Sequence, residues 1–248
     1  MDRITDYGHL KDRAVDWIKS YADENGIKSL VIGVSGGIDS AVVSTLCAET
    51  DLPVFVLGMP ILQNKEQESL SSNHLAWLVD KYANVVAHEI ELTPVFQSFC
   101  DTLSGHGFGS NNLALANSRS RLRMVTLYQV AGSTGGIVVG TGNKVEDYGV
   151  GFYTKYGDGG VDIAPIADLY KTEVWTLGKY LGVDPSIIDA PPTDGLWDDS
   201  RTDEDQLGAT YVELEQAMES SSGPAVEVLK KFNTLNKHKM IPIPTFKL

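Results

Sequence analysis

One short stretch of the sequence, residues 33 to 40, combines glycines, hydroxyl groups and an acid in a pattern that could bind a phosphate group. It reads Gly33, Val34, Ser35, Gly36, Gly37, Ile38, Asp39 and Ser40. Glycines let backbone N–H groups approach an anion closely, and serine hydroxyls add further donors. An acid inside such an anion site makes chemical sense when it holds Mg²⁺ on the phosphates. We therefore treat this stretch as a candidate phosphate site with Asp39 as a metal ligand.

The residues on either side predict the elements that position this stretch. Residues 30–34 form a short run rich in β-branched residues, as in buried parallel strands, and residues 41–48 carry apolar side chains at helical spacing. The candidate site is then a strand-to-helix turn, where free N–H groups and the positive end of the helix dipole favour an anion. No Lys-Ser or Lys-Thr pair follows the glycines, so the loop is not a Walker A sequence. The simpler alternative is a tight turn in which Asp39 is only a first-turn acid.

Length and composition limit the function classes. A chain of 248 residues can bury one sizeable core, and we expect residues 1–248 to form a single α/β domain. The formal net charge of −13 argues against nucleic-acid and membrane partners, because both need an extended basic face. No apolar run approaches the ~20 residues that span a bilayer. Cys47 and Cys100 lack metal-ligand spacing, which favours reduced thiols in a cytoplasmic protein.

The rest of the chain alternates helix and strand patterns. Helices are expected at residues 9–24, 75–82, 93 onward with Thr93 as N-cap, 113–130 and 169–181, and strands at 54–57, 85–92 and 137–139. Strands separated by helices predict an α/β fold with a doubly wound, mostly parallel sheet, whose ligand lies at the carboxyl ends of the strands. The polar stretch at 63–72 is a candidate mobile lid. Residues 149–160 are expected to form an irregular glycine-rich loop, and residues 198–205 a solvated acidic loop.

Positive charge gathers in two places in this acidic chain. Arg119, Arg121 and Arg123 fall within five residues, and on an ideal helix Arg119 and Arg123 share a face while Arg121 points away. Residues 228–248 hold five lysines and no acid. Solvated surfaces would explain both clusters. Because an anionic substrate needs local positive charge in such a chain, we interpret at least one arginine and the basic C-terminal stretch as candidate substrate contacts.

The stretch Ser-Gly-Gly-Ile-Asp-Ser at residues 35–40 resembles the pyrophosphate-binding loop of the ATP pyrophosphatase superfamily. Members of this superfamily split ATP into AMP and pyrophosphate to activate a carbonyl or carboxyl oxygen. The resemblance implies an adenine nucleotide α-hydrolase-like fold with ATP bound at this loop. It does not by itself choose the substrate, because GMP, asparagine, argininosuccinate and NAD synthetases and tRNA-modifying enzymes share the loop.

Longer motifs make the resemblance specific to NAD synthetases and extend it over nearly the whole chain. Residues 117–124, Asn-Ser-Arg-Ser-Arg-Leu-Arg-Met, resemble the family's Asn-x-(Lys/Arg)-x-Arg-x-Arg-Met segment. Residues 151–165 resemble its Gly-Phe-Phe-Thr-Lys-Tyr-Gly-Asp-Gly-Gly-x-Asp-x-x-Pro signature almost residue for residue. Residues 190–196 resemble its Pro-Thr-Ala-Asp-Leu, and His238-Lys239 matches its C-terminal His-Lys. Ordinary turn chemistry requires none of these strings.

The resemblance implies a role for each matched residue. Residues Gly33 to Ser40, Thr141, Lys171 and Thr193 would bind ATP, with Asp39 and Glu146 as Mg²⁺ ligands. The deamido-NAD substrate would be held by Arg121, Lys155, Asp162, His238 and Lys239. Asp158 would bind a second Mg²⁺ or accept a proton from ammonium. Hard oxygen ligands suit Mg²⁺, and cationic side chains neutralise the phosphates of both substrates.

The chain departs from the family pattern near Glu146, the second of the two implied Mg²⁺ ligands. The usual Gly-Thr-Asp-His is here Gly140-Thr141-Gly142-Asn143-Lys144, and the segment from Glu146 to Phe152 is one residue longer than in the commonest bacterial form. These differences affect the ATP site and the assignment of Glu146. Glu146 and Asp162 could also be ordinary loop acids that accept backbone N–H bonds.

The implied reaction is ATP-dependent amidation of deamido-NAD. The nicotinate carboxylate would attack the α-phosphorus of ATP to give an adenylate and pyrophosphate, and ammonia would then displace AMP. Glutamine-dependent relatives carry an additional amidase domain with a cysteine nucleophile. Here both cysteines fall in apolar helical patterns inside the synthetase region, so we expect free ammonia, or ammonia from a separate protein, as the nitrogen source.

Family resemblance also implies a homodimer with substrate at the interface. Two rival functions stay open at this point. A tRNA-thiolating pyrophosphatase would need nucleic-acid affinity and usually catalytic cysteines, and a non-catalytic ATP-sensing module would not need the 155–162 segment.

Overall fold

The computed structural model describes residues 3–193 and 202–247. Its elements in chain order are α1 (Tyr7–Asn25), β1 (Leu30–Gly33), α2 (Ile38–Ala48), β2 (Val54–Gly58), α3 (Lys65–Lys81), β3 (Val85–Glu89), α4 (Thr93–Ser104), α5 (Asn112–Thr134), β4 (Ile137–Val138), a π-helix η1 (Val145–Val150), α6 (Lys171–Leu181), α7 (Pro185–Ile188), α8 (Asp203–Leu207), α9 (Tyr211–Ser220) and α10 (Val226–Met240). Within the described residues, no helix is long and apolar enough to cross a membrane.

In the described part of the chain, the strands form one parallel sheet in the order β3-β2-β1-β4. The sheet starts at β1 and grows in both directions, because β1 pairs with β2 on one side and with β4 on the other. The strand order therefore reverses between β1 and β4. In open α/β sheets, a crevice at the carboxyl ends of the strands forms at such a reversal. The predicted doubly wound fold is confirmed, and its ligand position follows from the topology.

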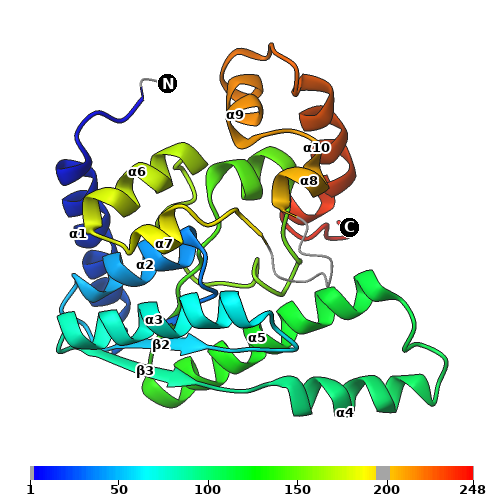
Figure 1. The fold of residues 1–248 in the computed structure, drawn as a ribbon, viewed down its shortest axis with the longest axis horizontal. Helices are drawn as coiled ribbons and strands as arrows, with labels where there is room; N and C mark the ends of the chain where they lie inside the picture. Colours follow the sequence, from blue (N-terminus) through cyan, green and yellow to red (C-terminus); the bar gives the residue numbers. More distant parts are fainter. Residues whose placement is uncertain (1–2, 194–201, 248) are drawn as a thin grey trace.

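Helices cover both faces of this sheet (Figure 1). One core cluster joins α1, α2 and α6 to β1 and β2 and includes the fully buried Ile18, Leu30 and Leu177. A second cluster on the other face packs α4 and α5 against the sheet through Phe96 and Ala131. The strands β1, β2 and β4 are largely buried, which explains their continuous apolar sequences, whereas the edge strand β3 is partly exposed and ends in His88 and Glu89.

A third cluster packs η1, α9 and α10 together, away from the sheet. Its fully buried members include Val145, Tyr211 and Leu214. In Figure 1, α9 and α10 lie above β2 and β3, and residues from α8 and α10 line the same cleft as the carboxyl ends of β1 and β4. The C-terminal quarter of the chain therefore forms the second wall of the ligand crevice.

The candidate lid at 63–72 is helical from Lys65 onward, where Asn64 caps α3 by accepting from the Glu66 N–H at 2.9 Å, and its role as a lid stays a prediction. Two local expectations were wrong. Leu92, not Thr93, is the N-cap of α4, and the Thr93 hydroxyl instead accepts from the Leu62 N–H. The acidic stretch at 198–205 falls partly outside the described residues, but its end is the capped helix α8, in which Asp203 is buried. Short polar stretches lack the apolar periodicity on which helix prediction depends.

Candidate active site

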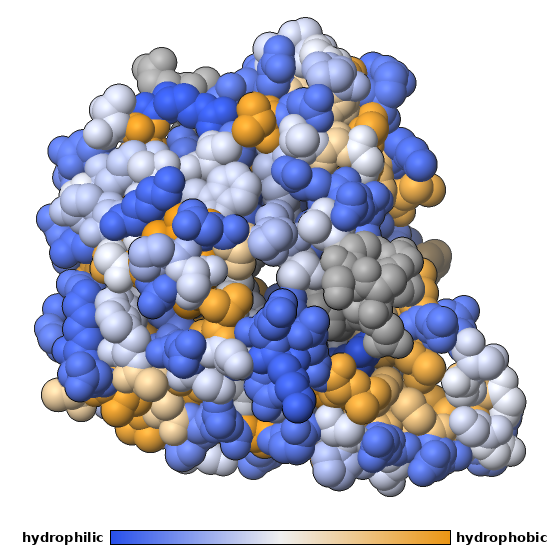
Figure 2. Space-filling view, viewed as in Figure 1, coloured by the Kyte–Doolittle hydropathy of each residue, from blue (hydrophilic) through white to orange (hydrophobic). Residues whose placement is uncertain are grey.

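A large cleft of about 1380 Å³ lies at the carboxyl ends of β1 and β4. Its walls come from the β1–α2 loop, the start of α3, α5, the 139–161 segment, the start of α6 and the end of α10. Figure 2 shows the surface hollowed between the upper and lower parts of the molecule, with hydrophilic residues at the opening. Of the residues singled out from the sequence, all those predicted to bind ATP or metal line this cleft.

The loop of residues 34–37 turns between β1 and α2 as its sequence predicts. Gly36 has φ 89°, and a Cβ there would lie 2.7 Å from the carbonyl oxygen of Gln67, so only glycine fits. The Ser40 hydroxyl donates to the Gly37 carbonyl at 2.9 Å, and Ser35 Oγ accepts from the Gly37 N–H at 3.2 Å. These bonds hold the turn at the N-terminus of α2, where backbone N–H groups and the helix dipole attract an anion.

Three charged side chains meet beside this loop. Lys171 Nζ, at the start of α6, donates to Asp39 Oδ2 at 2.5 Å and to Glu146 Oε1 at 2.9 Å. The Lys171 side chain is 3% exposed, and both carboxylates are 16% exposed. The structure therefore brings together Asp39 and Glu146, the predicted Mg²⁺ ligands, although 107 positions separate them in the printed sequence. The lysine predicted to contact ATP bridges them.

The ionisation of this cluster follows from burial and from mutual charge. Burial alone would lower the pKa of Lys171, but the charges of Asp39 and Glu146 outweigh it and raise the pKa. Burial raises the pKa of Asp39 in spite of the Lys171 ammonium. At Glu146 the effect of burial is outweighed by Lys171 and by a hydrogen bond from Tyr211, so the pKa is lowered. Glu146 is therefore the more firmly charged of the carboxylates.

The donor set fits a magnesium ion. Mg²⁺ binds through one or two carboxylates together with substrate phosphates and water, and does not need a cage made only of protein atoms. Among the described residues no group of three or more His, Cys, Asp or Glu side chains is arranged to hold a metal. Two carboxylates that already share a cation, beside a phosphate loop, match this partial ligand set.

Asn143 holds both arms of this cluster in place. Its Nδ2 donates to Asp39 Oδ1 at 3.1 Å, and its Oδ1 accepts from the backbone N–H groups of Val145 and Glu146. Asn143 is fully buried. The departure at Gly142-Asn143-Lys144 thus supplies a side chain that ties the phosphate loop to the start of η1. No sequence pattern had indicated this role.

Asp158 lies deeper along the cleft, on the 151–160 segment. Its Oδ1 accepts from the Ser120 hydroxyl at 2.6 Å and from the Thr154 N–H at 3.0 Å, so α5 and this segment share it. Burial raises the pKa of Asp158 against the effect of these bonds. A carboxylate with a raised pKa can accept and release a proton more readily near neutral pH.

A second acid here, Asp147, was not found from the sequence. Burial, with the charges of Glu146, Asp158 and Asp39, raises its pKa to about 7. A Cβ on Gly142 would overlap the Asp147 carboxylate, so the glycine makes room for this acid. Gly142, which departs from the family pattern, was the available signal for Asp147, since a glycine often marks a position that another group approaches closely.

The cationic wall combines three segments that are distant in the sequence. Arg121 donates from Nε and Nη2 to the Lys155 carbonyl, each at 3.3 Å, and Lys155 Nζ donates to the His238 carbonyl at 2.9 Å. Lys239 Nζ donates to the Tyr153 carbonyl at 2.7 Å, and burial lowers its pKa. The predicted deamido-NAD contacts Arg121, Lys155, His238 and Lys239 therefore meet on one side of the cleft.

Two charged residues that the sequence analysis singled out, Asp162 and Arg123, do not belong to this wall. Asp162, predicted to contact deamido-NAD, does not line the cleft. Its carboxylate accepts from the Val138 N–H at 2.8 Å and from the Tyr128 hydroxyl at 3.1 Å, beside β4. Arg123 points away from Arg121, as the helix geometry predicts, and donates to the Met59 carbonyl and to Gln63. Burial, then the charge of Arg119, lowers the pKa of Arg123 to about 10.

Comparison with known proteins places this cleft in a family. The family model described as NAD synthase matches residues 10–243. The chain belongs to the NAD synthase family. An NH(3)-dependent NAD(+) synthetase from Carboxydothermus hydrogenoformans is 37% identical over 236 residues, which cover 92% of this chain and 93% of the relative. The chain is a ligase of the NAD synthase family that amidates deamido-NAD with ammonia.

Two solved structures share the whole architecture of this chain. An NMN synthetase from Francisella tularensis superposes with a TM-score of 0.88 at 32% identity, covering 99% of this chain and all of that chain. An NH3-dependent NAD synthetase from Campylobacter jejuni, solved with a nitrate ion, gives a TM-score of 0.77 at 29% identity, covering 98% and 100% of the chains. The fold and family implied by the sequence motifs are confirmed.

Proposed function

We propose that this cleft performs the amidation through an adenylate. The phosphate loop would bind ATP, and the cationic wall would orient deamido-NAD so that its nicotinate carboxylate faces the α-phosphorus. The observation that carries this proposal is the placement of the phosphate loop, the Lys171 cluster and the cationic wall around one cleft. Holding both substrates in reactive geometry supplies much of the rate in such a reaction.

Asp39 and Glu146 would hold Mg²⁺, and the ion would neutralise charge on the ATP phosphates when bound. Their cluster with Lys171 supports this assignment, because the carboxylates already converge on a cation. Lys171 would then contact the phosphates, since a primary ammonium is a point charge suited to phosphate oxygens. Thr141 and Thr193 line the same region and would contact the nucleotide.

Asp158 would accept the proton that ammonium must lose before nitrogen can attack. Ser120 and the Thr154 N–H fix its carboxylate, and burial raises its pKa toward the working pH. Asp147 lies in the same acidic region and would favour entry of a cation such as ammonium. Attack by ammonia on the adenylate forms the amide and releases AMP.

The decisive experiment incubates the purified protein with ATP, Mg²⁺, ammonium and deamido-NAD and identifies all products. We expect AMP, pyrophosphate and NAD in equal amounts, and ¹⁸O from a labelled nicotinate carboxylate should appear in AMP. ADP with phosphate, or no turnover, contradicts the proposal. Label found in pyrophosphate or water contradicts the adenylate route alone.

A second candidate substrate is nicotinate mononucleotide, which is deamido-NAD without its AMP half. The superposition on the Francisella NMN synthetase, at a TM-score of 0.88 against 0.77 for the Campylobacter NAD synthetase, favours this candidate. The assay is a competition between the two substrates at limiting concentration, with NAD and NMN measured together. A kcat/KM ratio above about 10 in favour of the mononucleotide would make it the preferred substrate of the two.

We also propose a homodimer, supported by exposed apolar residues on α4, on the α4–α5 connection and at the start of α5. Figure 2 shows hydrophobic surface on the inner part of this arm, while its tip and lower edge are pale or hydrophilic. Val95, Phe108 and Leu113 are 51%, 71% and 59% exposed. An apolar patch of this kind on a soluble protein marks an interaction surface. Sedimentation equilibrium should give twice the chain mass. Phe108→Ser with Leu113→Ser should shift it to one chain mass.

A cytoplasmic location and a single synthetase domain over residues 1–248 belong to the same proposal. The free thiols of Cys47 and Cys100 agree with a reducing compartment. Fractionation of the source cells tests the location, and limited proteolysis of the purified chain tests the domain assignment.

A further inference from the structure

Tyr211, the first residue of α9, is fully buried in the third core cluster, and its hydroxyl reaches Glu146, which lines the active-site cleft. The hydroxyl donates to Glu146 Oε1 at 2.7 Å and lies 3.3 Å from Asp203 Oδ2. Its ring lies 4.9 Å from Lys171 Nζ and packs edge-on against Trp175. One side chain therefore contacts both the carboxylate and the ammonium of the cluster.

A phenylalanine would satisfy the packing alone. Burying a hydroxyl is unfavourable unless it forms a hydrogen bond, so this position keeps its oxygen for the bond that it makes to Glu146. The bond from a phenol to a charged carboxylate is a strong, directional one. Tyr211 is therefore arranged to fix the orientation of Glu146 as well as to fill space.

The geometry on Glu146 shows what the orientation achieves. Tyr211 and Lys171 both donate to the same oxygen, Oε1. Neither bond uses Oε2. A carboxylate that is held through one oxygen presents the other in a fixed direction, which is what a cation with strict ligand geometry requires.

We propose that Tyr211 is a positioning residue for the magnesium site, acting through Glu146. This inference rests on the proposed function, because it uses Glu146 as a metal ligand. Groups that orient metal ligands commonly change metal affinity or activity by about 10–100-fold when they are removed. Tyr211→Phe should therefore weaken the metal complex of the nucleotide while it preserves the ring contacts to Lys171 and Trp175.

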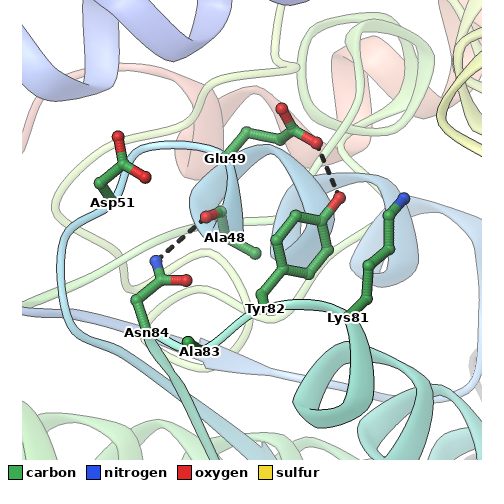
Figure 3. Close-up of a pocket in the computed structure, with 7 residues that line it drawn as sticks. All are labelled: Ala48, Glu49, Asp51, Lys81, Tyr82, Ala83 and Asn84. Atoms are coloured by element: carbon green, nitrogen blue, oxygen red, sulfur yellow. Dashed lines mark hydrogen bonds between the residues drawn. The ribbon is translucent and has the colours of Figure 1, made fainter.

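The chain offers a matched control in Tyr82. Its hydroxyl also donates to a glutamate, Glu49, at 2.7 Å, in a small pocket formed by the ends of α2 and α3 (Figure 3). That pocket shares no lining residue with the active-site cleft. Tyr82→Phe thus removes an equivalent bond without touching the site.

The test compares binding of the Mn²⁺ complex of α,β-methylene-ATP, followed by electron paramagnetic resonance, with binding of the metal-free nucleotide, followed by calorimetry. Tyr211→Phe should weaken the first by about 10–100-fold and leave the second within about threefold of wild type. Tyr82→Phe should leave both unchanged. Urea unfolding midpoints check that each variant is folded.

A Glu146→Gln background shows whether the effect passes through Glu146. Tyr211→Phe should add no further loss of Mn²⁺-complex affinity there, because the partner carboxylate is already gone. The inference is overturned if Tyr211→Phe and wild type bind the Mn²⁺ complex with equal affinity. It is also overturned if Tyr211→Phe loses as much affinity for the metal-free nucleotide as for the Mn²⁺ complex. These readouts need no turnover, so failure of the wild type to make NAD counts against the proposed function alone.

Discussion

Lys171→Met tests whether the buried lysine is the counter-ion of the Asp39 and Glu146 carboxylates. Methionine keeps most of the side-chain volume and removes the charge. The Lys171 side chain is 3% exposed and pairs with both acids, at 2.5 and 2.9 Å. Its loss leaves two carboxylates close together, each 16% exposed, with no compensating cation.

The expected loss of stability follows from that burial. Removing one partner of a buried ion pair costs about 3–5 kcal/mol, because the remaining charge stays desolvated. Lys230→Met is the matched surface control, since Lys230 and Glu227 form an i,i+3 pair in which the side chains are 67% and 85% exposed. An exposed helical pair of this kind contributes only about 0.3–0.5 kcal/mol.

Magnesium gives the assay its specificity. If the carboxylates bind Mg²⁺, the ion replaces the missing ammonium and should restore about 2.7 kcal/mol at a concentration 100 times its dissociation constant. Urea unfolding at pH 7 with and without Mg²⁺ measures both effects. The reasoning is refuted if Lys171→Met loses no more stability than Lys230→Met, or if Mg²⁺ stabilises the variant and the wild type equally.

Further changes test other parts of the site. Asp39→Asn should stay folded and lose at least about 100-fold in turnover, because it removes a charged metal ligand; near-normal activity at saturating Mg²⁺ would return Asp39 to the role of a helix-dipole acid. Lys155→Ala should raise the KM for deamido-NAD more than that for ATP, and equal effects would contradict its placement on the cationic wall. A double change of Cys47 and Cys100 to Ala should retain ammonium-dependent synthesis, whereas loss of activity in a folded variant would give a thiol a catalytic role. Burial lowers the pKa of His74 to about 4 from an ordinary 6.5, so the unfolded chain binds more protons between these values. Stability should therefore fall by up to about 3 kcal/mol as pH drops from 6.5 to 4, and His74→Gln should flatten that slope in urea unfolding.

The parts of the fold that sequence patterns predicted are those governed by local rules. The β-branched run at β1, the glycine turn with Gly36 at positive φ, and the apolar α2 all follow from residue preferences over a few positions. The order of strands and helices then implied the parallel sheet and the crevice at its carboxyl edge. Asp39 was found from local sequence as well, because a carboxylate in an anion-binding turn makes sense only if it holds a cation on the bound phosphates.

Side chains that act through distant partners were missed. Tyr211 lies 65 positions from Glu146 and begins an ordinary capped helix, so its sequence context indicates only a core position. Asn143 and Asp147 lie close in sequence to Glu146, the predicted metal ligand. Their roles depend on the π-helical turn η1, which no short sequence pattern predicts. π-helical turns are rare and recur at functional sites.

The placement of Lys171 shows why such sites cannot be found from spacing alone. A cation at the first turn of a helix is disfavoured by the helix dipole. Here the next residue, Thr172, donates through its N–H to the buried Glu215 at 2.9 Å, and Arg3 pairs with the same carboxylate at 3.0 Å. Glu173 accepts from the Tyr170 N–H at 2.9 Å, which adds a second negative charge at this end of α6. These acids offset the unfavourable dipole, and the charges of Asp39 and Glu146 themselves raise the pKa of Lys171. The site therefore depends on α9 and on the N-terminal segment, neither of which carries a motif.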